Sequence, residues 1–180
     1  MKPLARLFTA LVLFAFLIMG AALVYLRPPM QVAVPAPPPL IGQIDRIVVE
    51  KSARQMMLYQ NGTIIRKYAM ALGFAAIGDK SRQGDGRTPE GIYRINRRND
   101  RSAYHLSLGL DYPKPEDIAR AAAEGFDPGG DIMIHGQPNS FPDAAVIKGD
   151  WTAGCIAVSN AEIREIFAVT PIGTKVEIKP

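Results

Sequence analysis

The feature that most constrains this chain is an uncharged apolar run near its N-terminus, followed by a proline-rich stretch. Residues 7–26 (LFTALVLFAFLIMGAALVYL) carry no charge, and a helix needs about 20 apolar residues to cross a bilayer. Residues 28–39 contain six prolines, which fix φ and lack an N–H, so we expect an extended linker there. The sequence therefore predicts three parts: a signal-anchor or transmembrane segment at 1–27, a linker at 28–39 and one folded domain at 40–180.

The charges around the apolar run predict its orientation. Lys2 and Arg6 precede the run and only Arg27 follows it closely, so the positive-inside bias favours a cytoplasmic N-terminus. We expect a single-pass anchor in the inner membrane with the domain in the periplasm. A cleaved signal peptide, with Gly20 and Ala22 as the small residues before the cut, is the alternative, and it would release the domain into the periplasm.

Composition excludes several kinds of site. The three basic residues around the apolar run belong to a total of 21, which leaves 18 basic against 17 acidic residues in the rest of the chain. A nearly neutral domain is a poor match for nucleic acid, where a basic face supplies most of the affinity. One cysteine excludes an internal disulfide framework, and two histidines leave few ways to build a metal centre.

From residue 40 onward, the pattern predicts a mainly β domain with short helices, of the α+β class and mostly antiparallel. Asn61-Gly62 lies between two strand-like segments and suits a type I′ hairpin turn. Ser159 and Glu162 fit a capping box at the start of a helix that runs to about Phe167. We expect strands at 44–50, 55–60, 63–72, 92–96, 131–134 and 173–179, a helix at 116–124 and a long polar loop at 78–91.

Two residues stand out for their chemistry. Cys155 follows small residues, and His135 ends a short apolar strand. A thiol becomes a strong nucleophile as the thiolate, and an imidazole can take its proton. Gly154 permits a sharp turn, so that successive N–H groups could hold the oxyanion of an acyl-transfer intermediate. An inert buried thiol and a structural histidine are the alternatives, although an unpaired cysteine in an exported chain calls for an explanation.

Taken together, these motifs resemble the L,D-transpeptidase catalytic domain family, of the YkuD type. His135-Gly136 precedes Thr152-Ala-Gly-Cys155 by about the family's spacing, and Thr88-Pro-Glu-Gly-Ile-Tyr93, Gly84-Asp85 and the segment 127–136 match in the same order. The resemblance extends over about residues 44–178 and implies an antiparallel β-sandwich.

The resemblance also implies a reaction. Family members act on peptidoglycan stem peptides, where a cysteine attacks the carbonyl of meso-diaminopimelate and forms a thioester. Carried onto this chain, Cys155 is the nucleophile, His135 the general base, and the N–H groups of Ala153, Gly154 and Cys155 the oxyanion donors. Thr152 shapes the turn. No metal or organic cofactor is implied, and carbapenems are expected covalent inhibitors.

Departures from the family pattern affect the choice of acceptor. Ala153 and Ala157 stand where many transpeptidases carry polar residues. The form Trp151-Thr-Ala-Gly-Cys155-Ile-Ala-Val is closer to the subgroup around the murein peptide amidase DpaA, which releases a lipoprotein from peptidoglycan. The resemblance therefore implies hydrolysis or transpeptidation, with a slight preference for hydrolysis, and a wall-linked lipoprotein as a candidate partner.

Further residues are candidates for substrate contact. They are Gly136, Tyr104, His105, Tyr112 and Trp151, and the loop 137–150 is a candidate lid. The basic cluster of Arg94, Arg97, Arg98 and Arg101 is either a solvated surface or a contact for stem-peptide carboxylates.

Two other function classes remain open from the sequence. One is a metallohydrolase that uses His105, His135 and either Asp127 or Asp131, although no close ligand spacing supports it. The other is a non-catalytic wall-binding module that keeps the fold without turnover. The presence of both Cys155 and His135 argues against the second class.

Overall fold

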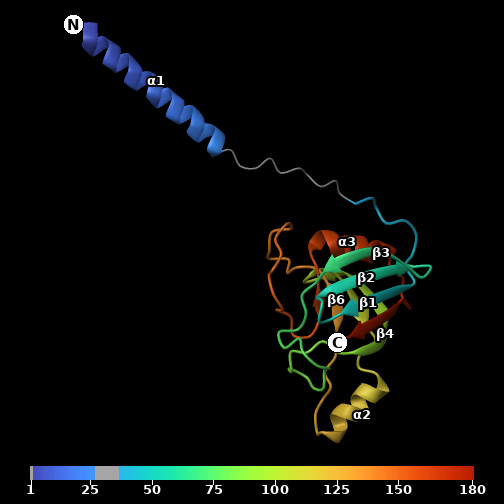
Figure 1. Ribbon diagram of the computed structural model, residues 1–180. Helices are drawn as coiled ribbons and strands as arrows, with labels where there is room; N and C mark the ends of the chain where they lie inside the picture. The colour runs from blue at the N-terminus through green and yellow to red at the C-terminus, as the bar shows by residue number, and fades with distance from the viewer. Residues whose placement is uncertain (1, 27–36) are drawn as a thin grey trace. The chain divides into compact units, whose positions relative to one another are not determined.

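The computed structural model describes residues 2–26 and 37–180 (Figure 1). The chain divides between Pro38 and Pro39 into two compact units. The first contains helix α1 (Lys2–Tyr25), so the apolar run is helical as predicted. Within the part of the chain that the structure describes, no helix is long and apolar enough to cross a membrane. Most of the predicted linker at 28–39 lies outside the described residues.

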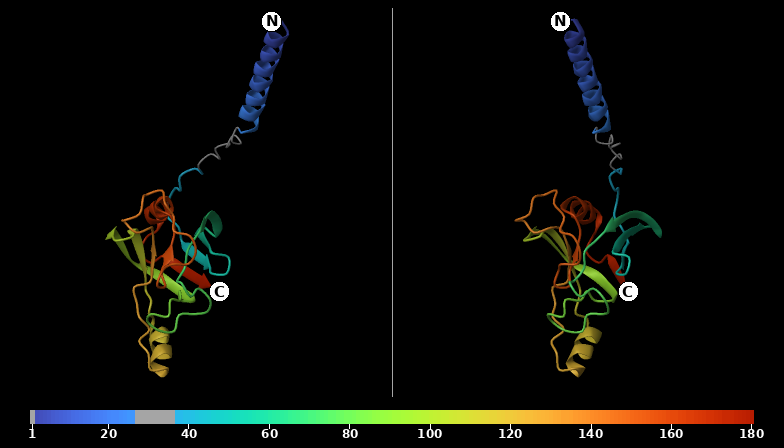
Figure 2. Two further views of the ribbon diagram at one scale, coloured as in Figure 1. Left: turned by 90° about the vertical axis from the view of Figure 1, so that its left-hand side faces the viewer. Right: turned by 60° about the vertical axis from the view of Figure 1, so that its left-hand side comes forward.

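The second unit is built on one curled sheet of eight strands, in the order β3-β2-β1-β8-β4-β5-β6-β7 (Figure 2). In chain order, the strands and helices are β1 (Arg46–Glu50), β2 (Gln55–Gln60), β3 (Thr63–Ala69), β4 (Gly91–Ser102), β5 (His105–Leu110), α2 (Pro115–Ala123), β6 (Met133–His135), β7 (Ile156–Ala157), α3 (Asn160–Val169) and β8 (Lys175–Lys179). Helix α2 stands at the opposite end of this unit from α3 (Figure 1). The predicted mainly β class with short helices is therefore confirmed.

The predicted antiparallel β-sandwich is corrected in two respects. First, β1 pairs with β8, and β6 with β7, in parallel. Second, the two halves of the sheet are continuous through β4, whose residues 91–94 pair with β8 and whose later residues pair with β5. Register shifts after Ile95 and Asn99 let this long strand bend. Adjacent hairpins can be predicted from local turns. Strands β1 and β8 lie at opposite ends of the domain's sequence, so no local turn predicts their pairing.

Local signals identify several elements correctly. Asn61 and Gly62 both have positive φ, at 52° and 77°, as the predicted hairpin turn requires. The Ser159 Oγ accepts a hydrogen bond from the Glu162 N–H at 3.2 Å, and the Glu162 carboxylate accepts one from the Ser159 N–H at 2.8 Å, which confirms the capping box. Strands β5 and β7 are not among the predicted strands. The start of β5 was interpreted as part of a substrate groove, through Tyr104 and His105, and β7 has only two residues.

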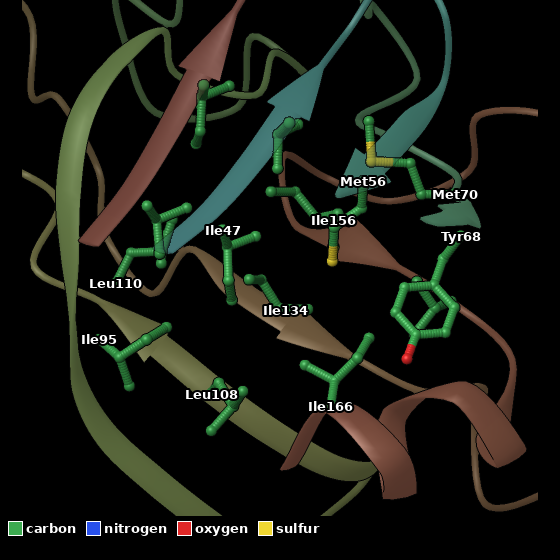
Figure 3. Close-up of a cluster of buried hydrophobic side chains, with 14 of the residues drawn as sticks. Ile47, Met56, Tyr68, Met70, Ile95, Leu108, Leu110, Ile134, Ile156 and Ile166 are labelled. Carbon is green, nitrogen blue, oxygen red and sulfur yellow. The ribbon is translucent and has the colours of Figure 1, made fainter. Parts of the chain in front are cut away.

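Apolar side chains from both halves of the sheet meet in one core (Figure 3). Ile47 from β1, Leu108 from β5 and Ile134 from β6 are fully buried. Ile156 from β7 and Ile166 from α3 close the same cluster. The residues next to the predicted nucleophile and base, Ile156 and Ile134, are thus buried anchors. Their burial holds the ends of β6 and β7 in place.

Candidate active site

Cys155 and His135 line the same pocket, of about 510 Å³. Strand β6 ends at His135, and Cys155 directly precedes β7. The two strands run parallel, with Ile134 opposite Ile156 and His135 opposite Ala157. The parallel pairing therefore brings the imidazole and the thiol to one region from positions twenty residues apart.

The turn before Cys155 is closed by the side chain of Thr152. Its hydroxyl donates to the Cys155 carbonyl at 2.7 Å and accepts from the Gly154 N–H at 3.1 Å. Gly154 has φ of 140°, and a Cβ there would lie 2.8 Å from the carbonyl oxygen of Arg87, so only glycine fits. Because its N–H is already used, Gly154 is not an oxyanion donor in this arrangement. The N–H groups of Ala153 and Cys155 have no hydrogen-bond partner among the described residues.

The tautomer of His135 follows from its one ring hydrogen bond. Nδ1 lies 2.7 Å from the carbonyl oxygen of Gly136, and a carbonyl can only accept, so Nδ1 carries the proton. Nε2 is left with a free lone pair. The side chain is buried, and burial lowers the pKa of His135 although the Gly136 hydrogen bond opposes it. The ring is therefore neutral near pH 7 and able to accept a proton.

The thiol of Cys155 is also neutral at rest. Burial raises its pKa; the Met133 N–H opposes this effect, and the nearby Asp131 charge adds to it. The cations of Lys80 and Arg97 partly offset the rise. The Sγ donates to the Asp131 carbonyl at 3.4 Å, not to the imidazole. Proton transfer to His135 thus requires the thiol to turn away from that carbonyl, as is common before a substrate binds.

Two aromatic rings surround the imidazole. The ring of Tyr104, from the β4–β5 hairpin, lies 4.6 Å from the His135 ring between centroids. The Trp151 ring is edge-on to His135 at 5.8 Å. Both residues line the pocket. These two substrate-contact candidates are therefore brought to the site.

Three other candidates are placed elsewhere. The His105 ring contacts Arg164 at 3.1 Å. The Tyr112 side chain is buried, and its hydroxyl donates to the Pro128 carbonyl. A Cβ on Gly136 would lie 2.6 Å from the Asn160 side chain, so this glycine permits close packing against α3. None of the three lines the pocket.

The loop 137–150 does not cover the pocket, because none of its residues lines it. Asn139 connects this loop to the β4–β5 hairpin: its amide donates to the Ser102 carbonyl, and its side-chain oxygen accepts from the His105 N–H. The lid prediction is therefore not supported, and the loop acts as a brace for the hairpin that carries Tyr104.

The sequence indicated Asp131 only as a candidate metal ligand, but its carbonyl lies next to the sulfur of Cys155. Asp131 borders the thiol pocket and a second pocket of about 370 Å³, and Cys155 lines both. Its φ of 56° is rare for a residue with a side chain. The two glycines before Asp131 indicate a turn there, but only the fold places that turn against Cys155.

The alternative metal site is not assembled. Among the residues that the structure describes, no group of three or more His, Cys, Asp or Glu side chains could hold a metal ion. The two histidines point to different surroundings, with His135 in the pocket and His105 against Arg164.

Comparison with known proteins identifies the family. The profile of the YkuD family, described as the L,D-transpeptidase catalytic domain, matches residues 44–178. The chain belongs to this family. It is therefore a domain of the L,D-transpeptidase enzyme family, and the matched range contains every residue of the pocket.

Individual relatives agree with this assignment. A protein of Escherichia coli strain K12 named "Putative L,D-transpeptidase YafK" is 29% identical over 134 residues, which cover 71% of this chain and 48% of the relative. This chain thus spans about half the length of the curated relatives that it matches.

Solved structures show the same fold. The helical cell shape determining protein Pgp2 from Campylobacter jejuni superposes with a TM-score of 0.58 at 26% identity, over 77% of this chain and 48% of that one. Bd1075 from Bdellovibrio bacteriovorus has a TM-score of 0.54 at 25% identity, over 77% and 48%. The curled sheet with helices α2 and α3 is therefore the L,D-transpeptidase fold.

Proposed function

We propose that this L,D-transpeptidase-family domain is an exported cysteine enzyme that cuts peptidoglycan stem peptides at the carbonyl of diaminopimelate. Water is the preferred acceptor, so that the enzyme releases an amine, such as that of a wall-linked lipoprotein. The observation that carries the proposal is the shared pocket of Cys155 and His135. Export follows from the location of the substrate outside the cytoplasm.

In the acylation step, the sulfur of Cys155 attacks the carbonyl carbon while its proton passes to Nε2 of His135. Both groups are neutral at rest, because burial raises the pKa of the thiol and lowers the pKa of the imidazole. The free N–H groups of Ala153 and Cys155 stabilise the oxyanion. His135 then gives the proton to the leaving amine as the C–N bond breaks, and a thioester remains.

In the deacylation step, water attacks the thioester carbon and gives a proton to His135. The C–S bond breaks, the sulfur takes the proton back from His135, and a carboxylic acid leaves and loses its own proton to the solvent. The hydrogen bond from Nδ1 to the Gly136 carbonyl holds the ring in one tautomer through both steps. Transpeptidation differs only in that an amine replaces the water.

The alternative acceptor and the non-catalytic module are separated by one experiment. The full chain is incubated with muropeptides, with and without a covalently linked lipoprotein peptide, and the products are weighed by mass spectrometry. Hydrolysis adds one water to the acyl fragment, and transpeptidation joins it to a second amine. Absence of turnover, together with absence of Cys155 acylation by a carbapenem, would support the wall-binding module instead.

A further inference from the structure

Among the four arginines of β4, Arg97 extends toward the candidate active site. The Arg94 side chain donates to the Gly173 carbonyl, and the Arg98 side chain donates to the Thr170 carbonyl. The Arg97 guanidinium instead donates to the Asp131 carboxylate at 2.6 Å. Its positive charge also lowers the pKa of the Cys155 thiol, against the larger effect of burial.

The path of the Arg97 side chain is set by a glycine. Arg97 in β4 pairs with Gly109 in β5, which pairs with Met133 in β6. A Cβ on Gly109 would lie 2.6 Å from Cγ of Arg97, so the arginine stem crosses β5 over the bare backbone. The guanidinium thus reaches the Met133 sulfur and Asp131, two strands away.

Asp131 presents its carboxylate at the boundary of both pockets that contain the sulfur. Its main-chain carbonyl accepts the hydrogen bond from Cys155, and its side chain is 83% exposed. The left-handed backbone conformation, with φ of 56°, costs free energy in a residue with a Cβ, and such strain is concentrated at functional sites.

We propose that Arg97 and Asp131 form a subsite for an amino-acid end that carries a free ammonium and a free carboxylate. The carboxylate binds the guanidinium and the ammonium binds Asp131. This inference rests on the proposed function, in which the third residue of the stem peptide, diaminopimelate, carries such an end on its side chain. The subsite would bind the side-chain end of diaminopimelate while the carbonyl of the same diaminopimelate residue faces Cys155.

The exposure of the pair favours a binding role over a structural one. Arg97 is 45% exposed, and an ion pair in contact with water contributes little to stability. The Arg97 Nε and Nη1 have no hydrogen-bond partner among the described residues, so donors remain for a ligand. By contrast, the Lys80–Asp85 pair behind the second pocket is buried at 3% and 7% exposure, and it holds its own loop together.

The first test compares two muropeptides that differ only at the third residue, which is meso-diaminopimelate in one and L-lysine in the other. Lysine lacks the side-chain carboxylate. We expect kcat/KM of the full chain to be about tenfold higher for diaminopimelate, as for the loss of one charge-assisted hydrogen bond. Equal values for the two substrates would overturn the subsite.

Variants then assign the selectivity to the pair. Arg97→Gln should reduce the ratio of kcat/KM between the diaminopimelate and lysine muropeptides toward one. Gly109→Ala should reduce this ratio too, although it removes no charge, because the added methyl group displaces the arginine stem. Asp131→Asn tolerates the left-handed backbone and should weaken binding through KM. Arg101→Gln removes a neighbouring charge on the same strand and should keep the ratio. If Arg97→Gln keeps the full ratio, the proposal is wrong.

A second readout needs no turnover. We expect D-2-aminobutyrate, which copies the zwitterionic end, to slow the alkylation of Cys155 by iodoacetamide. Its amide and its N-acetyl derivative each lack one charge and should not slow it. Protection that is lost in Arg97→Gln supports the subsite even if no muropeptide is cut, in which case the proposed function alone fails. Absence of protection in the wild type counts against the subsite even if muropeptides are cut.

Discussion

Among the cavities that border the segment carrying Cys155, the two largest differ in how their polar groups are used. The larger, of about 630 Å³, is lined by Asp150, Gln137 and Arg54, among others. Asp150 accepts from the Arg54 guanidinium and from the Leu72 N–H, and both ends of the Gln137 amide are hydrogen-bonded. These polar groups hold the backbone in place.

The smaller cavity, with Cys155 and His135, leaves polar groups unused. Nε2 of His135 and the N–H groups of Ala153 and Cys155 have no hydrogen-bond partner among the described residues. These groups are available to a ligand, whereas the side chains of Asp150 and Gln137 in the larger cavity are used by the protein's own hydrogen bonds. Cavity size therefore does not identify the site here, whereas the state of its polar groups does.

The largest effect is expected from removal of the two reactive side chains. Cys155→Ala and His135→Ala should each reduce muropeptide turnover at least about 1000-fold, because the nucleophile or its base is lost. Both proteins should remain folded, with thermal unfolding close to that of the wild type. Retained turnover in either variant would contradict the assignment of chemistry to the smaller cavity.

The larger cavity should respond in stability and not in chemistry. Asp150→Ala leaves the Leu72 N–H and the Arg54 guanidinium unpaired, and we expect a loss of about 3 kcal/mol in the free energy of unfolding. Denaturant titration measures the loss, with the exposed Asp100→Ala as control. If the folded variant lost turnover as completely as Cys155→Ala, the contrast between the cavities would not hold.

Acid should destabilise the loop that contains Lys80 and Asp85, beside the 370 Å³ pocket. Burial alone would raise the pKa of Asp85, but hydrogen bonds from Lys80 and from the N–H groups of Arg87, Ser81 and Arg82 lower it to about 2. A lowered carboxyl pKa adds stability above its ordinary value near 4, and this stability disappears as the pH falls toward 2.

We expect Asp85 to contribute about 2 kcal/mol at neutral pH by this linkage. The Asp85→Asn variant should therefore show a smaller loss of stability between pH 5 and pH 2 than the wild type, in denaturant titrations at each pH. If the free energy of unfolding fell equally with pH in the two proteins, the Asp85 carboxylate would not have the lowered pKa on which this prediction depends.

The smallest effect concerns the helix cap at the edge of the larger cavity. Ser159→Ala removes the acceptor of the Glu162 N–H, and we expect a loss of about 1 kcal/mol in unfolding free energy, with turnover unchanged. Ser140→Ala, in the exposed loop, is the matched control. A reduction in turnover per folded molecule would mean that this cavity takes part in the reaction.

Some of the structure could be predicted from sequence because its causes are local. The Asn61-Gly62 turn and the Ser159–Glu162 cap depend on residues within a few positions of each other, and both are confirmed. The motifs around His135 and Cys155 predicted the family, which the family match confirms. Their catalytic roles stay a prediction until turnover is measured.

Other predictions failed where the outcome depends on contacts with residues elsewhere in the chain. Tyr112 resembles a groove residue in sequence, but it packs against Tyr93 in the core. The Gly154 N–H was expected to be free, but the Thr152 hydroxyl uses it. The role of Gly109 depends on the arginine stem that crosses it from another strand. Each of these outcomes depends on which side chain arrives from elsewhere in the chain.

By itself, the sequence determined the mainly β class, the capped helix and the family, and it predicted the pair Cys155 and His135, because short-range turn chemistry and motif order follow from neighbouring residues along the chain. Only the tertiary structure decided that one curled sheet forms, that its parallel pairing brings His135 and Cys155 to one pocket, and that Arg97 pairs with Asp131 at the border of that pocket. Strand pairing between distant segments depends on the burial of the whole core, and no local pattern encodes it.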